Sequence, residues 1–314
     1  MNGIIKRTVE TTLDVVPEYP LSELERLAPL LSRINVLSAS VAGNGELLCG
    51  EDERPAAFAA ERDIPAMLTV SCGEAKYARR LFTDEDAESR FFEKLAERLA
   101  AGNFAGANFE FLNLFPFDRS NYTEFLKKAA AVLHENACLA GSIAAPPCAL
   151  SLAAANDYEA QGEYLDSVNI LLSGCLYLRN SPCRRMADDA LAETLAFAGK
   201  AVPGHKLAVT LADHALAYTE NGVCQVLPAA LVRSISAPNS EFDGERDYAR
   251  LFDIIAAYPV SDISIRSYSR TDKMIFDVIA DKFDIQHGIS PQESLEFAPN
   301  REIVFHVKQA LIWT

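Results

Sequence analysis

Short apolar runs rich in β-branched residues alternate with amphipathic segments along the whole of this 314-residue chain. Eight of the runs have the length and composition of strands: Thr8–Val16, Arg33–Ser40, Pro65–Ser71, Gly106–Leu112, Leu139–Ala145, Ser167–Ser173, Lys206–Ala212 and Asp262–Tyr268. Most of them are too apolar for a strand with one wetted face, which is typical of a parallel sheet covered by helices. The alternation therefore predicts an α/β fold.

The segments between the runs carry start signals for helices. Ser22, Thr83, Asp118 and Asp243 each precede an apolar stripe at helical spacing, and acids follow Thr83 and Asp243 as the helix dipole favours. Eight strand–helix units in a chain of this size predict a (β/α)8 barrel, the TIM barrel. A doubly wound open sheet remains the alternative, because periodicity does not show closure. No Gly-x-Gly-x-x-Gly follows any run, so a dinucleotide crevice is not expected.

Two segments break this rhythm. Residues 213–242 contain Glu220–Val223, whose sequence Glu-Asn-Gly-Val is a hairpin-turn signal, so a small insertion is expected after the seventh strand. Residues 288–314 lie beyond the eighth unit and end in an apolar stretch with Trp313. We expect one barrel over residues 1–287, insertion included, and a tail that packs on the barrel or on a partner.

The composition restricts the partners and the compartment. A formal net charge of −15 argues against nucleic acid or an anionic membrane as the main partner. No apolar run has the length of a membrane span, and Met1–Lys6 is not followed by the apolar stretch of a secretory signal. The seven cysteines are irregularly spaced, so reduced thiols and a cytoplasmic or spore-associated setting are expected.

One strand and the helix after it carry a recognisable pattern. The sequence Gly102–Leu112 resembles the signature strand of glycoside hydrolase family 18, the family of chitinases and peptidoglycan N-acetylglucosaminidases. That signature reads Asp-Gly-x-Asn/Asp-x-Asp-x-Glu, and its last residue is the general acid. Gly106 and Asn108 fit the pattern, and Glu110 stands where the second Asp belongs.

The resemblance extends from Thr8 to Ile285 and is strongest for the spore peptidoglycan-hydrolase branch of the family. The similar segments include Asp118–Phe125, Asp157–Gly162 and Asp262–Arg270. It implies a (β/α)8 barrel that needs no cofactor and whose ligand is a glycan containing N-acetylglucosamine. A protein of the envelope or the spore is the other partner that it suggests.

The alignment with the family's pattern also shows departures at the catalytic positions. In this family a Glu protonates the leaving oxygen while the acetamido group of the sugar attacks. Leu112 stands where that Glu belongs, and Ala105 replaces the first Asp of the signature. Ser173 stands where a Tyr holds the acetamido group, and Arg266 where a Trp forms the floor of the sugar subsite. The resemblance therefore implies activity that is absent or strongly impaired.

The candidate site residues are Asn108, Glu110, Ser173, Asp213 and Arg266. Because side chains alternate along a strand, Asn108 and Glu110 should both point into the barrel. Glu110 is a displaced acid, a ligand contact, or one partner of an ion pair inside the barrel, with Arg266 as the candidate cation.

A metal site and an anion clamp are two weaker possibilities. Cys72, Cys148 and Cys175 each follow a strand, as do Asp213 and His214, and thiolates with an imidazole can bind zinc. Their spacing matches no metal motif, and free cysteines are commonly small buried apolar residues, so we expect no metal. The pair Arg184 and Arg185 could bind a ligand anion, although such a pair is usually solvated.

Three functions follow from these observations. The first is a non-catalytic or nearly inactive barrel, similar to family 18, that binds a glycan or an envelope or spore protein. The second is an active glycoside hydrolase on peptidoglycan or chitin-type substrates whose acid has moved to Glu110, or to a loop carboxylate such as Glu18 or Asp213. The third is an assembly protein in which side chains simply fill the barrel mouth.

Overall fold

The structure is a computed structural model that describes residues 6–111, 114–133, 138–144, 155–172, 188–218, 224–235, 240–241 and 243–286. Leu112, Ser173, Cys148, Cys175, Arg184 and Arg185 lie outside these ranges, as does the tail of residues 288–314. No helix within the described residues is long and apolar enough to cross a membrane.

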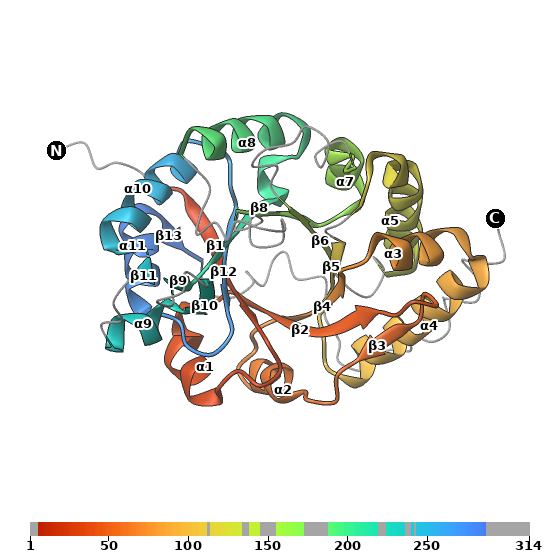
Figure 1. Cartoon of the computed structure of the whole chain (residues 1–314), viewed down its shortest axis with the longest axis horizontal. Helices are drawn as coiled ribbons and strands as arrows, with labels where there is room; N and C mark the ends of the chain where they lie inside the picture. Colours follow the sequence, from red (N-terminus) through yellow and green to blue (C-terminus); the bar gives the residue numbers. More distant parts are fainter. Residues whose placement is uncertain are drawn as a thin grey trace.

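Eight parallel strands form a closed barrel (Figure 1). In order around the barrel they are β1 (Thr8–Val15), β2 (Arg33–Val41), β4 (Ala66–Cys72), β5 (Gly106–Phe111), β6 (Cys138–Ala144), β7 (Ser167–Leu171), β8 (Leu207–Ala212) and β12 (Asp262–Ser267). Strand β1 pairs in parallel with both β12 and β2, and these two pairings close the ring. The predicted (β/α)8 barrel is confirmed, and the open-sheet alternative is wrong.

The strand boundaries agree with the apolar runs to within one or two residues. The fourth run illustrates this, because β5 spans Gly106–Phe111 against the expected Gly106–Leu112. The sixth run gives β7 over Ser167–Leu171, two residues shorter than expected at its carboxyl end.

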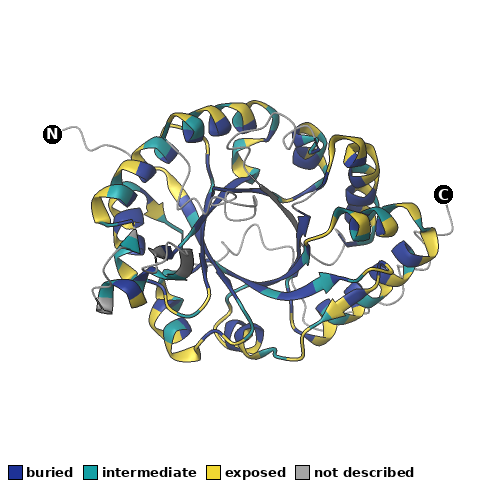
Figure 2. Cartoon of the chain, viewed as in Figure 1, coloured by how far each residue is buried: buried dark blue, intermediate teal, exposed yellow. Residues whose placement is uncertain are grey.

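Helices form a layer around the strands, and their buried sides face the barrel (Figure 2). The α-helices are α1 (Leu21–Leu27), α2 (Arg54–Ala60), α3 (Ala75–Thr83), α4 (Glu85–Ala101), α5 (Arg119–Leu133), α7 (Tyr158–Tyr164), α8 (Asp188–Ala201), α9 (Ala229–Ile235), α10 (Glu245–Ala256) and α11 (Lys273–Lys282). Short 3-10 turns are η1 (Ala28–Leu30), η2 (Pro116–Asp118) and η4 (Gly204–Lys206).

Two of the expected helix starts are corrected. Thr83 is the last residue of α3, and the N-cap of α4 is Asp84, whose side chain accepts a hydrogen bond from Ala87 N at 3.1 Å. A carboxylate is as good a cap as a hydroxyl, so Asp84 takes the position expected for Thr83. Helix α1 begins at Leu21, one residue before Ser22, and its N-cap is Pro20.

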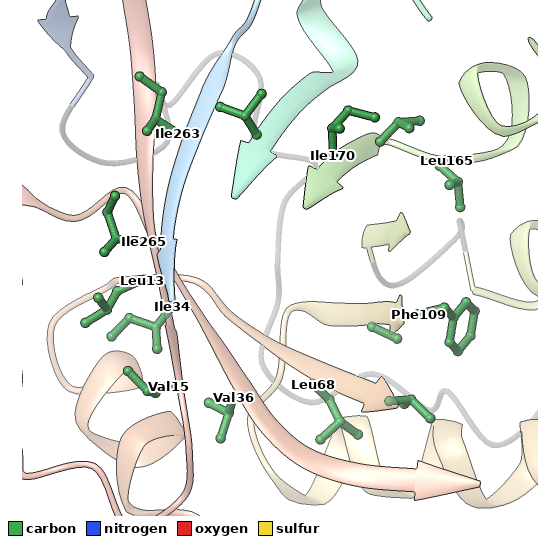
Figure 3. Close-up of a cluster of buried hydrophobic side chains, with 14 of the residues drawn as sticks. Leu13, Val15, Ile34, Val36, Leu68, Phe109, Leu165, Ile170, Ile263 and Ile265 are labelled. Carbon is green, nitrogen blue, oxygen red and sulfur yellow. The ribbon is translucent and has the colours of Figure 1, made fainter. Parts of the chain in front are cut away.

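The space between sheet and helices is filled by the outward-facing apolar residues of the strands. Figure 3 shows Leu13 and Val15 of β1, Ile263 and Ile265 of β12, and Phe109 of β5 among them. All five side chains are fully buried. Burying such a side chain contributes about 1.5–3 kcal/mol, so this shell holds the helices on the barrel.

The insertion after the seventh strand is confirmed as a small sheet with one helix. Strands β9 (His214–Tyr218), β10 (Cys224–Pro228) and β11 (Ser240–Glu241) pair antiparallel in the order β10-β9-β11, and α9 follows β10. The expected turn at Glu220–Val223 falls in residues outside the described ranges, but the strands on either side of it pair as a hairpin requires.

Two further short strands extend the barrel. Strand β3 (Leu47–Cys49) pairs antiparallel with the carboxyl end of β2. Strand β13 (Asp284–Ile285) pairs with Thr8 and Val9, at the amino end of β1. The described chain therefore ends at the face opposite the one where (β/α)8 barrels carry their sites.

Candidate functional site

The inward-facing positions of the barrel carry polar side chains. Along β1, β5 and β12 they alternate with the apolar residues that face the helices. The buried polar residues of the barrel strands include Thr12, Asp14, Asn35, Thr69, Asn108, Glu110, Asn169, Thr210, Ser264 and Arg266. Branched apolar residues usually fill such an interior, so hydrogen bonds and ion pairs must stabilise this one.

The centre of this interior is an ion network around Arg266. Its guanidinium donates to both oxygens of Glu110, from Nη1 to Oε1 at 3.0 Å and from Nη2 to Oε2 at 2.6 Å. It also donates to Asp14 Oδ2, from Nη2 at 3.0 Å and from Nε at 3.3 Å. The ion pair of Glu110 with Arg266, offered as one alternative from the sequence, is present.

Asp14 is fixed from two more sides. Its Oδ1 accepts hydrogen bonds from Ser264 Oγ at 2.7 Å and from Asn35 Nδ2 at 2.8 Å. The side chains of Asp14, Arg266 and Glu110 are 0%, 3% and 6% exposed, so water screens these charges little. We call Asp14, Glu110 and Arg266 the buried triad; its two carboxylates and one guanidinium carry a formal charge of −1.

The buried triad spans the barrel. Strand β5 is four strands away from β12 in either direction around the closed sheet, so the two strands face each other across the interior. Glu110 and Arg266 nevertheless lie within hydrogen-bond distance. Their side chains therefore meet across the interior and occupy it at this level, near the carboxyl ends of the strands where barrel sites form.

Asn108 lies one inward position below Glu110 and is also buried. Its Nδ2 donates to Thr69 Oγ1 on the neighbouring strand β4 at 3.2 Å. A similar bond joins Asn169 Nδ2 to Thr210 Oγ1 at 2.6 Å on the other side of the barrel. The expectation that Asn108 and Glu110 both point inward agrees with these contacts.

Asp213 begins the insertion and forms a separate cluster at the rim. Its backbone N–H donates to Arg266 O at 3.0 Å, and its Oδ2 accepts from Asp272 N, at the start of α11, at 3.0 Å. Arg233 of α9 lies 3.6 Å from Asp213 Oδ1 and 3.0 Å from Asp272 Oδ2. Arg233 also donates to Asp243 O at 2.8 Å, so this cluster fastens the insertion to the barrel.

The environment of Asp213 favours its neutral form. Burial raises the pKa of Asp213 to about 6, although the hydrogen bond from Asp272 N and the charge of Arg233 act in the opposite direction. The side chains of Asp272 and Asp243 add to the increase through like charge. A carboxyl group with such a pKa can donate a proton near neutral pH, so Asp213 has the pKa that a general acid needs.

The remaining sequence candidates are not brought together. Ser173 lies outside the described residues, and Glu18 is exposed in the loop after β1. Cys72 ends β4, where burial raises the pKa of its thiol and its Sγ lies 3.5 Å from Glu74 O. Among the described residues no group of three or more His, Cys, Asp or Glu side chains is arranged to hold a metal ion.

Asp14, the second carboxylate of the buried triad, is not among the site residues expected from the sequence. The signal was present, because Asp14 is a charged residue inside an otherwise buried strand, at the same alternation phase as Thr12. A charge in such a position requires a partner. The partner lies 252 residues away on β12, which only the closure of the barrel reveals.

No family model matches this chain. Among curated proteins, the cortical fragment-lytic enzyme of Bacillus subtilis (strain 168) is 22% identical over 208 residues, which cover 62% of this chain. The match spans 48% of that enzyme, about half its length.

Solved structures share the fold over most of the chain. The spore cortex-lytic enzyme SleL of Bacillus cereus superposes with a TM-score of 0.77 at 17% identity, covering 91% of this chain and 77% of that one. A chitinase from Chromobacterium violaceum has a TM-score of 0.73 at 17% identity, with 87% and 99% covered. The GH18 chitinase ChiB of Flavobacterium johnsoniae has a TM-score of 0.66 at 13% identity, with 88% and 94% covered. The resemblance to glycoside hydrolase family 18 and its spore branch, first seen in the sequence, is thus confirmed for the fold.

Proposed function

We propose that this chain, which has the fold of family-18 glycosidases, is a non-catalytic or strongly impaired relative that binds a glycan containing N-acetylglucosamine. The structural neighbours are named as chitinases and spore cortex-lytic enzymes, which supports a glycan of the chitin or peptidoglycan type. A spore setting follows from the same names. An envelope or spore protein is the alternative partner.

The observation that supports this proposal is the buried triad. A general acid must hold a proton and reach the leaving oxygen. Both oxygens of Glu110 accept hydrogen bonds from the guanidinium of Arg266, so the carboxyl group is already occupied by this partner and is turned toward it. Leu112 has no proton to donate at the position of the family's acid. The chain therefore keeps the barrel while its central carboxylate serves the structure.

Binding is tested by co-sedimentation with insoluble chitin and with purified spore-cortex peptidoglycan. We expect the protein to appear in the pellet and to be released by soluble N-acetylglucosamine oligomers. Bovine serum albumin serves as the control for nonspecific adsorption. Equal recovery of both proteins in the supernatant, with either polymer, would remove the glycan from this proposal.

A second candidate is an active hydrolase whose acid is Asp213, and the raised pKa of that residue favours it. The competing observation is that Asp213 is 2% exposed and lies beside Arg233 and Asp272 N. This arrangement favours a structural clasp over a proton donor facing a substrate. Turnover that disappears in Asp213→Asn but survives in Glu110→Gln would select the second candidate.

A further inference from the structure

Exposed apolar side chains gather in the segments that follow the carboxyl ends of the barrel strands. Among the described residues, the exposed large apolar side chains are Leu21, Leu48, Phe115, Phe117, Phe197, Leu231 and Tyr268. Phe115, Phe117 and Tyr268 follow the carboxyl ends of β5 and β12, and Leu21 begins the helix that follows β1. Leu48 lies in β3, which pairs with the carboxyl end of β2, Leu231 lies in α9 of the insertion, and Phe197 lies within the outer helix α8. The apolar surface is thus concentrated on the face where barrel sites form.

Two of these residues form a defined pair after β5. The rings of Phe115 and Phe117 are stacked with an interplanar angle of 2° and centroids 5.5 Å apart. Their side chains are 50% and 68% exposed. Two parallel rings left in water beside the barrel mouth have no role in the core, so a ligand is the natural reason for them.

The backbone beneath the rings is rigid. Pro116 separates the two residues within η2, and Asp118 Oδ2 accepts from Phe115 N at 2.9 Å. Arg79 of α3 donates from Nε to Asp118 Oδ1 at 2.6 Å, and its guanidinium lies 4.6 Å from the Phe117 ring centroid. Asp118 is only 1% exposed, so this scaffold is anchored in the fold. The backbone that carries the rings is therefore fixed by contacts within the protein, which limits the entropy lost on binding.

The two charged residues that follow Phe117, Asp118 and Arg119, are both paired. Arg79 pairs with Asp118, and Arg119 pairs with Asp157 with Nη2 and Oδ2 3.0 Å apart. The second pair is partly exposed, at 47% and 28%, and Arg119 follows Phe117 by two residues in the chain. The formal charges of these two ion pairs sum to zero, although the whole chain has a net charge of −15. This local neutrality favours a neutral ligand over a polyanion or a polycation.

We propose that Phe115 and Phe117 form a stacking platform for the pyranose rings of a neutral glycan. The C–H face of a pyranose carries partial positive charge and complements the negative face of an aromatic ring. Its hydroxyl and acetamido groups lie at the edge of the sugar and need hydrogen-bond partners, which the partly exposed guanidinium of Arg119, two residues after Phe117, can supply. This inference rests on the proposed glycan-binding function and assigns it to the end of β5, away from the buried triad.

The experiment measures binding of a soluble N-acetylglucosamine hexamer by isothermal titration calorimetry. We expect the Phe115→Ala/Phe117→Ala double variant to bind at least about tenfold more weakly, as for truncated aromatic anchors at other interfaces. Phe117→Trp should retain affinity, whereas Phe117→Leu should lose it, because stacking needs a flat ring. Phe197→Ala is the matched control, since this phenylalanine is 53% exposed on α8 and should leave binding unchanged. Unchanged melting temperatures establish that the variants are folded.

The possible failures are distinct. If the unmodified protein binds and the double variant binds equally well, the platform is wrong while the glycan-binding function stands. Phe117→Leu binding as tightly as the unmodified protein would contradict the stacking, because a general apolar contact would then suffice. If no glycan binds at all, the result contradicts both the platform and the proposed glycan-binding function. Self-association that the double variant abolishes, seen by analytical ultracentrifugation, would instead assign these rings to a contact between two copies of the chain.

Discussion

Arg266 bridges Asp14 on the neighbouring strand β1 and Glu110 on the other side of the barrel, and its substitution should be far more harmful than that of either acid. Arg266→Met leaves Asp14 and Glu110 without their shared cation, which for a buried pair costs about 3–5 kcal/mol. Glu110→Gln keeps an oxygen that accepts from the guanidinium, and Asp14 still balances Arg266. We expect Glu110→Gln to lower the free energy of unfolding by less than half as much as Arg266→Met does.

Urea denaturation of the two variants beside the unmodified protein measures these losses. The surface ion pair of Arg54 with Asp52 provides the control, because the Arg54 side chain is 58% exposed. Arg54→Met should therefore lower the free energy of unfolding by only about 0–1 kcal/mol. Equal losses in Arg266→Met and Glu110→Gln would show that the network does not depend on its single cation.

Asp213 makes stability depend on pH in a direction opposite to that of a salt-bridged surface acid. Its folded pKa of about 6 lies above the ordinary value of 3.8 for an aspartate, so the folded state binds the proton more tightly. The stabilisation from this proton is complete below the unfolded pKa and is lost as pH rises toward and through 6. The shift of about two pKa units corresponds to at most about 3 kcal/mol.

The comparison of Asp213→Asn with the unmodified protein isolates this contribution, since burial also raises the pKa of Asp262 to about 6. We expect the stability of Asp213→Asn relative to the unmodified protein to increase between pH 4 and pH 7 by up to about 3 kcal/mol. The exposed Asp281→Asn serves as the reference substitution. A difference that stays constant over this pH range would show that Asp213 does not titrate on folding.

At the scale of the elements, the sequence predicted the strands well because each is a compact apolar run between turn signals. The strands Arg33–Val41 and Asp262–Ser267 differ from the expected runs by a single residue at one end. Helix starts were less certain, since Thr83 and Asp84 are both good caps and only the structure shows which carboxylate or hydroxyl accepts the hydrogen bond.

The residue types of the candidate site could be predicted from the sequence, but the contacts between them only in part. Alternation places Glu110 inward, and a buried carboxylate requires a cation, so Arg266 could be named from the sequence. The role of Asp14 depends on the pairing of β1 with β12, where Asp14 lies opposite Arg266 in the register. Phe115 and Phe117 carried no sequence signal, because exposure is a property of the assembled fold.

For the whole molecule, the barrel should fold without residues 288–314. The described chain ends with β13 on the amino end of β1, and Gln286 N donates to Val9 O at 2.8 Å. The core residues Ile275, Phe276, Ile279 and Phe283 all precede this point. We expect a chain ending at His287 to melt within a few degrees of the full chain, by calorimetry at equal concentration. A much lower melting temperature would mean that the tail belongs to the barrel domain.

The central claim is that this barrel does not hydrolyse the glycans of its fold relatives. The direct measurement is the release of new reducing ends from N-acetylglucosamine oligomers and spore-cortex peptidoglycan, followed by mass spectrometry. We expect no product above the enzyme-free blank, and none with Leu112→Glu alone, because Ser173 and Arg266 still replace the family's tyrosine and tryptophan. Loss of general-acid assistance alone lowers rates by about 10²–10⁴-fold. Robust turnover by the unmodified protein that Glu110→Gln abolishes would contradict the account and identify Glu110 as a working acid.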